Sequence, residues 1–469
     1  MPVLFLLAPL CGVFALNLPK RSAAVRFAPW LVGLITVSQA IVGITSQLGI
    51  WQSTDDLLRP IMPLDLSVDW FTAIMLFAIA MVVTAANAVG FDGDDRKKVL
   101  ARSLLLVCMA GMNGVVMVRD LLSVYVFLEI TAVSCFALIA IDKKIEAIGG
   151  AFKYYILSGL ATFAMILANA LVFMKVGSLK FVDVQAALDG AGIELQIALT
   201  LYVIALCVKA GVAPFHGWLP DAHASAPNAV SVLLSGVVIK VAGAYLIIRL
   251  LADVFAGQAG AGRAFMVLGA FSIALGAFGA IAQQDMKRVL AFSSVSQMGY
   301  IVLAAGLGTK LALMGAIIHI INHAMFKSLL FVNAAAVKEQ TGTTELDQLG
   351  GLTERMPATG WTSVVGLLSA AGVPPTSGFW SKLFIILALC LEGQWVFAGI
   401  ALSMSIVTLG YLLLLQRKVF FGKLRAGLED LEEARKSLTG TAIVLATMTT
   451  IAGLAFPLLL IVLRNIGYL

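Results

Sequence analysis

Long runs of apolar residues make up most of this sequence, and short segments rich in charged residues, glycine and proline separate them. A helix needs about 20 apolar residues to cross the roughly 30 Å hydrocarbon core of a bilayer. The pattern therefore predicts an all-α polytopic membrane protein with fourteen transmembrane helices, at 3–16, 28–50, 69–90, 98–118, 121–141, 148–174, 194–218, 225–250, 264–283, 286–307, 309–337, 357–391, 395–420 and 439–463.

Two stretches, the first apolar run and the charged segment near the end of the sequence, differ from the other apolar runs and loops. The run at 3–16 lacks the basic start and the small-residue cleavage site of a signal peptide, so we expect it to be retained as a helix. The charged segment between Gly422 and Gly440 holds i,i+4 pairs such as Glu432 and Lys436. Such pairs predict a short surface helix rather than a linker between domains.

Composition agrees with this class and sets an orientation. Hydrophobic residues make up 60% of the chain and charged residues 12%, which excludes a soluble globular protein and makes nucleic acid an improbable partner. Lysine and arginine concentrate in the loops that follow odd-numbered helices, so the positive-inside rule places both termini on the outer side of the membrane. The five cysteines stand singly in apolar runs. Their spacing predicts neither disulfides nor a metal cluster, and no haem, flavin or iron–sulfur site is expected.

Two apolar runs are interrupted in the same way. The sequence AGVAPFHGW at 210–218 matches AGVPPTSGF at 371–379 with a constant offset of 161 residues. Proline removes a backbone donor and breaks a helix, and freed backbone groups at that depth must face protein or water. Five helices separate the two breaks, so the two halves run in opposite directions. Paired breaks in inverted halves point to a transport site near the midplane.

Few ionisable residues lie deep within the predicted helices, and all are candidate functional groups: Glu129, Lys209, Lys240, His319, His323, Lys327 and Lys382. Each unpaired Glu or Lys at the helix centre costs about 2.5–3.5 kcal/mol, so these groups must be paired, hydrated or neutral. Lys209 could instead snorkel to an interface, and Glu129 could be a structural partner that only neutralises a lysine. The break that follows Lys209 favours a hydrated cavity.

His319, His323 and Lys327 are spaced four residues apart and line one stripe of a helix. Two histidines with this spacing could bind a metal, but no third ligand or zinc-protease signature accompanies them. A proton relay is the preferred interpretation, because histidine titrates near neutral pH. His216 and His223, in the predicted loop HGWLPDAHASAP, serve capping or loop packing at least as well as proton entry.

Lysine suits proton transfer in such a setting. Burial favours the neutral amine, whereas a nearby carboxylate favours the ammonium. Movement or screening of Glu129 could therefore switch Lys209 between a protonated and a neutral state.

At these residues the chain resembles a known family. KAGVAPFHGWLPDAHASAPNAVSVLLSGVVIK, DMKRVLAFSSVSQMGY, HIINHAMFKSLLF and GVPPTSGFWSK look like signature segments of the antiporter-like subunits shared by respiratory complex I, energy-converting membrane hydrogenases and Mrp-type sodium/proton antiporters. The resemblance spans about 1–463. It implies helices 7 and 12 broken and four regions: 1–97 with helices 1–3, a first inverted five-helix repeat at 98–250, a second at 264–420, and 421–469 with the charged segment and helix 14.

The resemblance also implies roles for the buried charges. Glu129 would be the helix-5 glutamate, Lys209 the helix-7 lysine and Lys240 the helix-8 connector. His319, His323 and Lys327 would form the helix-11 relay, with Lys382 as the terminal group of helix 12. Partners would be other membrane subunits, including further antiporter-like ones, peripheral redox subunits if the complex is redox-driven, and the lipid bilayer of the energy-transducing cell (inner) membrane. The transported ion would be the proton, with sodium as the alternative.

Three functions remain open on these observations. The first is the proton-translocating subunit of a complex I-like redox-driven pump, which the loop WLPDAHASAPNAVSVLLSGVVIK favours. The lack of a long lateral helix makes the chain resemble the shorter subunits of the family. The second is a subunit of an Mrp-type antiporter. The third is a non-conducting structural membrane subunit, which would have little reason to retain every buried charge.

Overall fold

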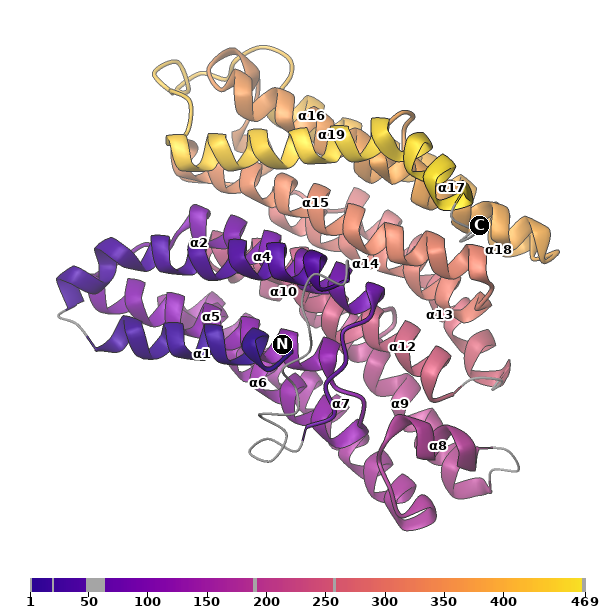
Figure 1. The fold of residues 1–469 in the computed structure, drawn as a ribbon. Coiled ribbons are helices and arrows are strands. Elements are labelled where there is room, and N and C mark those ends of the chain that lie inside the picture. The colour runs from indigo at the N-terminus through magenta and orange to yellow at the C-terminus, as the bar shows by residue number, and fades with distance from the viewer. Residues whose placement is uncertain (1, 19–20, 48–63, 189–191, 256–258, 466–469) are drawn as a thin grey trace. The chain divides into compact units, whose positions relative to one another are not determined.

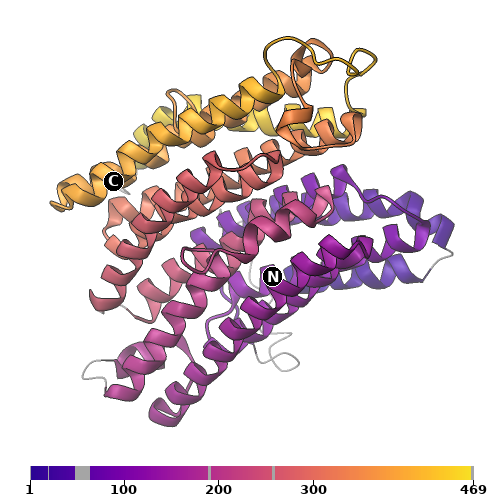
Figure 2. The ribbon, with the colours of Figure 1, turned by 180° about the vertical axis from the view of Figure 1, so that it is seen from behind.

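The computed structural model describes residues 2–18, 21–47, 64–188, 192–255 and 259–465. Within these ranges strand pairing is limited to three isolated bridges, and twelve helices are long and apolar enough to cross a membrane. The predicted class, an all-α multi-pass membrane protein, is confirmed (Figures 1 and 2). The chain divides into two compact units, Met1–Phe265 and Met266–Leu469.

Unit 1 is a helical bundle in which α5 packs on α6, α7 on α9, and α2 on α4. A π-helical stretch, η2 (Leu234–Val238) and η3 (Lys240–Tyr245), lies between α11 and α12. The described α-helices are α1 (Pro2–Asn17), α2 (Arg21–Ser46), α4 (Trp70–Val89), α5 (Asp95–Met117), α6 (Leu121–Ile139), α7 (Ile145–Val176), α8 (Phe181–Ala187), α9 (Ile193–Ala210), α10 (Trp218–Ser225), α11 (Asn228–Leu233) and α12 (Leu246–Asp253).

Unit 2 contains most of α13 and the helices that follow, with α15 packed against α14, α16, α17 and α19. Its helices are α13 (Ala259–Ile281), α14 (Met286–Leu307), α15 (Lys310–Thr341), α16 (Pro357–Ala371), α17 (Ser377–Leu391), α18 (Trp395–Val419) and α19 (Lys436–Asn465). The central position of α15 matters for function, because this helix carries the predicted histidine stripe.

Every predicted run overlaps a helix, but two runs hold helices shorter than a full crossing. The first contains α1, with 16 residues, and the run at 357–391 is divided into α16 and α17, with 15 residues each. The run at 194–218 was predicted to end at 218, whereas α9 ends at Ala210 and helical structure resumes in α10. Both interruptions coincide with the Gly/Pro segments identified in the sequence.

The charged segment before α19 does not form the predicted surface helix. Residues 421–435 are irregular, and Gly422 and Gly427 adopt positive φ angles that a right-handed helix does not allow. The charged side chains bond to other elements: the Glu433 carboxylate accepts the backbone N–H of Ala358 at the start of α16, and Arg435 pairs with Glu339 at 3.2 Å. These tertiary contacts replace the expected i,i+4 pairs.

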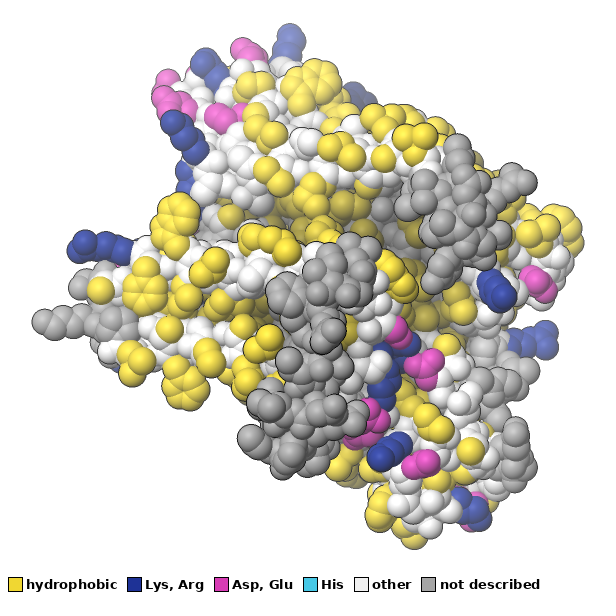
Figure 3. All heavy atoms as spheres, in the orientation of Figure 1, with side chains coloured by type: hydrophobic (Ala, Val, Ile, Leu, Met, Phe, Trp, Pro, Cys, Tyr) yellow, Lys and Arg dark blue, Asp and Glu magenta, His cyan; other side chains and the backbone are white. Residues whose placement is uncertain are grey.

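The molecular surface has the distribution expected of a bilayer-embedded protein. Large apolar side chains such as Trp30, Phe14 and Phe163 are more than two-thirds exposed. Figure 3 shows yellow apolar side chains along the visible sides of α1, α2 and α19, while charged side chains gather at the loops beside α16 and α19. Helix sides that carry apolar residues and ends that carry charges fit a membrane-spanning bundle.

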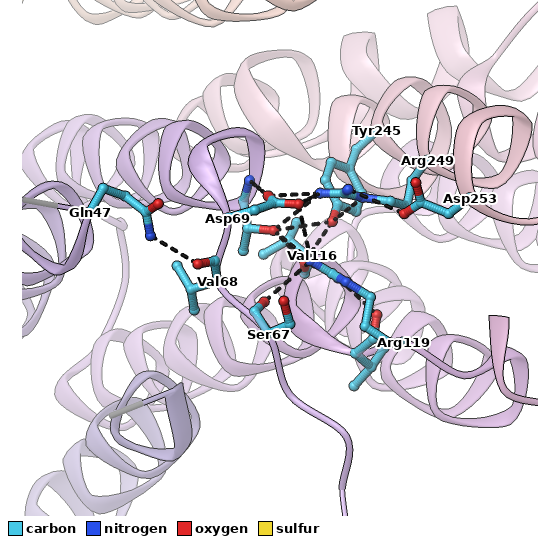
Figure 4. A network of polar contacts seen from close by, with 11 residues as sticks. Gln47, Ser67, Val68, Asp69, Val116, Arg119, Tyr245, Arg249 and Asp253 are labelled. Carbon is cyan, nitrogen blue, oxygen red and sulfur yellow. Dashed lines mark hydrogen bonds and ion pairs between the residues drawn. The ribbon is translucent and has the colours of Figure 1, made fainter. Parts of the chain in front are cut away.

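One network of hydrogen bonds and ion pairs connects several helix ends of unit 1 (Figure 4). Asp69 caps α4 by accepting the Thr72 amide, and its carboxylate pairs with Arg249 of α12 at 2.7 Å and Arg119 at 3.5 Å. Arg249 also pairs with Asp253 at 3.2 Å. The start of α4, the α5–α6 junction and the end of α12 therefore meet on one side of the bundle, as alternating crossings require.

We expect Asp69 to stabilise unit 1. Burial raises the pKa of this carboxyl, but Arg249, the Thr72 amide and Arg119 together bring it below its usual value. Its stabilising effect is therefore present above the pKa of the unfolded chain and is lost as pH falls through the folded pKa. Asp69→Ala, which also removes the cap, should cost about 1 kcal/mol and a few degrees of melting temperature.

The test is thermal unfolding of the detergent-purified protein. Asp69→Asn keeps a good capping side chain and removes the charge, so it should destabilise less than Asp69→Ala at neutral pH. Its difference from the wild type should vanish in acid below the folded pKa of Asp69. A difference that persists unchanged there would show that the charge is not what matters.

Candidate functional site

The break in unit 1 begins directly after the lysine that the sequence singled out. Helix α9 ends at Ala210, and Gly211 follows with φ 65°, a left-handed conformation that favours glycine. The Val212 amide donates to the Cys207 carbonyl at 2.9 Å, and the Trp218 indole donates to the Val208 carbonyl at 3.1 Å. These bonds close the end of α9 and satisfy backbone groups that the break would otherwise leave unpaired.

Lys209 is buried and its ammonium lies in a polar cluster made by three helices. Nζ lies 3.4 Å from a carboxylate oxygen of Glu129 on α6, and it donates to the Ser158 hydroxyl at 2.7 Å and the Thr162 hydroxyl at 3.0 Å on α7. Thr162 in turn donates to Glu129 at 2.5 Å. The Lys209 side chain is 2% exposed and that of Glu129 34%. Lys209 therefore lies in the interior of unit 1, whereas part of the Glu129 side chain reaches the surface of this unit.

Ser158 and Thr162 were not identified from the sequence. They lie four residues apart on α7, so both hydroxyls face the same side of that helix. Serine and threonine are common in membrane helices, where they bond back to their own backbone, and Thr162 also donates to the Ser158 carbonyl at 2.9 Å. A polar i,i+4 pair within an otherwise apolar helix was the available signal, but it does not reveal which charge the pair contacts.

Lys240 lies at the start of the π-helical segment η3 and is fully buried. This segment contacts α9. A Cβ on Gly243 would lie 2.4 Å from the Cα of Ala210, so glycine permits the two backbones to approach beside Lys209. π-Helical turns are rare and occur frequently at functional sites. The structure therefore places Lys240 in an irregular segment that packs against the end of the Lys209 helix.

The predicted loop around His216 and His223 is partly helical, so the loop interpretation is wrong for His223. This residue belongs to α10 and is fully buried. Pro220 is the third residue of α10, where a missing N–H costs no intrahelical bond, and it therefore does not prevent the helix. His216 lies in the break itself, between α9 and α10.

The break in unit 2 has the same local construction. Gly372 follows α16 with φ 82°, and the Val373 amide donates to the Leu368 carbonyl at 3.0 Å. Each break also contains one cis X-Pro bond, at Pro214 and Pro375, again 161 residues apart. The sequence match thus corresponds to a match in backbone conformation.

Lys382, on α17 after the second break, turns back toward the end of α16. Its ammonium donates to the carbonyl oxygens of Ala370 at 2.9 Å and Ala371 at 3.1 Å, and to the Ser405 hydroxyl at 3.3 Å. It also lies 4.8 Å from the centre of the Tyr300 ring. Ala370 stands 161 positions after Lys209, so the Lys382 ammonium lies beside the position in the second half that corresponds to Lys209.

The histidine stripe of α15 is buried and reaches the Lys382 helix. His319 Nδ1 lies 2.9 Å from the Ser381 hydroxyl, and the rings of His319 and His323 are 6.2 Å apart. One turn further along, Lys327 donates to the Leu290 carbonyl of α14 at 2.8 Å. Asn322 binds the Ser377 carbonyl at 2.6 Å beside the second break. His319 and Asn322 therefore contact α17 beside the second break, whereas Lys327 contacts α14.

The seven predicted residues thus divide between the two units, three in unit 1 and four in unit 2. In unit 1 a lysine has a carboxylate partner and hydroxyl neighbours, which allows its charge state to depend on that carboxylate. In unit 2 two histidines and two lysines lie beside hydroxyl and carbonyl groups. Groups of this kind, a few ångströms apart in a buried setting, can hold a proton and pass it on.

Comparison with known proteins finds one matching family model and several similar proteins. Residues 118–408 match the family model described as NADH:quinone oxidoreductase/Mrp antiporter, TM. The chain is 28% identical to the D component of the Na(+)/H(+) antiporter of Alkalihalophilus pseudofirmus, over 91% of this chain and 87% of that protein. It is 37% identical to the N component of the NADH-quinone oxidoreductase of Desulforudis audaxviator, over 66% of this chain and 62% of that protein.

A solved structure gives the same fold. A chain of the Mrp complex from Dietzia sp. DQ12-45-1b aligns with a TM-score of 0.87 at 24% identity, covering 98% of this chain and 95% of that one. At this identity the agreement concerns the fold alone.

Proposed function

Because the chain belongs to the NADH:quinone oxidoreductase/Mrp antiporter transmembrane family, we propose that it is the proton-translocating subunit of a complex I-like redox-driven pump. The host would be of the quinone-reductase or membrane-bound-hydrogenase type. The alternative host is a multisubunit Mrp-type sodium/proton antiporter, which the match to the Na(+)/H(+) antiporter component along 91% of the chain supports. Both are multisubunit membrane assemblies, so other membrane subunits are the expected partners.

The observation that carries this proposal is the ion pair between Lys209 and Glu129 at a broken helix. A buried lysine next to a backbone break has access to polar groups and water that an intact apolar helix would not offer. Its carboxylate partner favours the ammonium, and displacement of that partner favours release of the proton. A scaffold that only binds neighbouring subunits would need neither the pair nor the break.

We propose fourteen membrane crossings with two inverted five-helix repeats, at helices 4–8 and 9–13. Three pairs of features support the repeat. Asp120 and Asp285, 165 residues apart, each cap a helix by accepting an amide three residues ahead. The isolated bridges Asp120–Lys180 and Asp285–Glu345 keep that spacing, and the two breaks have matching geometry. Both termini would lie on the outer side of the inner membrane, with the basic loops inside.

The proposed proton route uses the buried groups of both units. In unit 1 a proton would be held by the Glu129–Lys209 pair and passed to Lys240. In unit 2 it would pass along His319, His323 and Lys327, with Lys382 as the last station before release. Lys382 suits release because its contacts are neutral carbonyl, hydroxyl and aromatic groups. Such groups stabilise the ammonium less than a carboxylate does, so the lysine gives up its proton more readily.

Glu129→Gln tests the role of the carboxylate. This change keeps the side-chain shape and removes the charge that favours ammonium at Lys209, so we expect pumping to fall at least tenfold. Glu129→Asp should fall less, because a carboxylate remains. The measurement is pH-gradient formation in membrane vesicles, normalised to assembled complex. Glu194→Gln, which removes a surface partner of Lys175, is the matched control and should pump normally.

The host can be assigned by purification of the tagged subunit from its native membrane. A redox-driven host should reduce its acceptor and acidify one side of reconstituted vesicles without sodium. An Mrp-type host should instead exchange sodium for protons with no redox substrate. Wild-type pumping by the Glu129→Gln protein in either host would remove the glutamate from the mechanism.

A further inference from the structure

Tyr300 lies between the histidine stripe and Lys382, and it is the last residue of the segment DMKRVLAFSSVSQMGY, in which no role was assigned to it. Its ring is fully buried on α14. The ring centre lies 4.8 Å from the Lys382 ammonium and 6.0 Å from the centre of the His319 ring. Its hydroxyl donates to the Ala401 carbonyl of α18 at 2.7 Å. The ring is therefore held in place at one edge while its face meets a cation.

The ammonium of Lys382 has contacts unlike those of Lys209. Its hydrogen-bond partners in the described chain are two backbone carbonyls at the end of α16 and the Ser405 hydroxyl of α18. The titratable groups that face this cluster are His319 and Lys327 from α15, and Tyr300 and Tyr411 from α14 and α18. No described ion pair joins Lys382 to a carboxylate. Beyond these hydrogen-bond partners, the negative face of the Tyr300 ring lies 4.8 Å from the ammonium.

We propose that Tyr300 is a positioning residue for Lys382, with its ring face stabilising the ammonium and its bond to Ala401 fixing the ring. A cation over an aromatic face is attracted by the ring quadrupole, more strongly in a desolvated site than in water. The helix C-terminus of α16 adds partial negative charge from its carbonyls. Together these groups keep Lys382 able to take a proton, yet they hold it less firmly than a carboxylate would.

This inference rests on the proposed function, because it assigns Tyr300 a part in proton release by Lys382. A ring that only fills space would affect stability but not the pH at which the subunit works. A ring that stabilises the ammonium would also affect the pH dependence of pumping. Loss of such a ring disfavours the protonated form of Lys382, so the alkaline limb of the curve of pumping against pH should move to lower pH.

The experiment uses the complete complex in reconstituted vesicles and records pumping against pH. Tyr300→Phe keeps the ring face but loses the bond to Ala401, so it should shift the profile in the same direction and by less than Tyr300→Leu. Tyr300→Leu should shift the alkaline limb by about one pH unit toward acid, given the usual strength of a buried cation–π contact. Phe420→Leu, which removes another buried ring of unit 2, is the matched control and should cause no shift.

A second series keeps the outcome decisive if Tyr300→Leu fails to assemble. Phenylalanines carrying one, two and three fluorine atoms, introduced at position 300, preserve shape while weakening the negative face of the ring. The alkaline limb should move progressively toward acid along the series. A flat series would overturn the inference while leaving the proposed function intact, whereas normal pumping by Lys382→Ala would overturn the proposed function itself.

Discussion

Replacement of Lys209 by alanine should abolish proton pumping by the assembled complex. The change removes the only cation that the Glu129 carboxylate contacts within ion-pair distance in the described chain, and it removes the proton carrier at the break. Loss of a group that transfers a proton commonly costs a factor of 10² or more. We therefore expect pH-gradient formation to fall about a hundredfold, to the background of the vesicles.

The complex carrying Lys209→Ala must be shown to assemble before its loss of pumping is attributed to the missing lysine. Lys153→Ala provides a matched control, since Lys153 also pairs with a carboxylate of unit 1, Asp221, at 2.5 Å, but its side chain is 61% exposed. Exposed pairs contribute little to stability, so this variant should pump normally. Near-normal pumping by assembled Lys209→Ala would mean that the lysine is not part of the route.

Lys382→Ala should block release from unit 2 and reduce net pumping about as much as Lys209→Ala. The change removes the ammonium that the Ala370 and Ala371 carbonyls and Ser405 surround. Loading is expected to continue, so Lys209 should still change its protonation state in this variant. Reconstituted complexes with a pH-sensitive dye inside the vesicles give the measurement.

A carboxylate at the same position should restore part of the activity. Lys382→Glu can also hold and release a proton, though at a shifted pH, so we expect intermediate pumping with an altered pH optimum. Lys418→Ala, which removes a partly exposed lysine of unit 2, is the control that should pump normally. Wild-type pumping by Lys382→Ala would show that protons leave elsewhere.

Periodicity and composition sufficed for the membrane class and for the approximate position of the long apolar helices, because a run of about 20 apolar residues is long enough to cross a bilayer as a helix. The breaks were also predictable, since glycine and proline act locally on the backbone: α9 and α16 both end immediately before the AGV glycines. Buried charges were found because they are expensive in hydrocarbon. Each of these signals belongs to a residue or its immediate neighbours.

Features that depend on tertiary contacts were missed or mistaken. Ser158 and Thr162 become part of the site only because α7 packs against α9, and Tyr300 only because its ring meets a lysine from another helix. The segment before α19 failed as a predicted helix for the same reason, since Glu433 is used to cap α16. Local charge pairs worth a few tenths of a kcal/mol are easily overridden by such contacts.

We propose that Lys209 carries a proton rather than a permanent charge, and Lys209→Arg separates these two roles. Arginine keeps the cation beside Glu129, so the complex should assemble, but its guanidinium is not deprotonated in proteins. We predict that vesicles containing the assembled Lys209→Arg complex form no more pH gradient than those with Lys209→Ala. Gradient formation at the wild-type rate would contradict the account, because a cation that never releases its proton would then be sufficient.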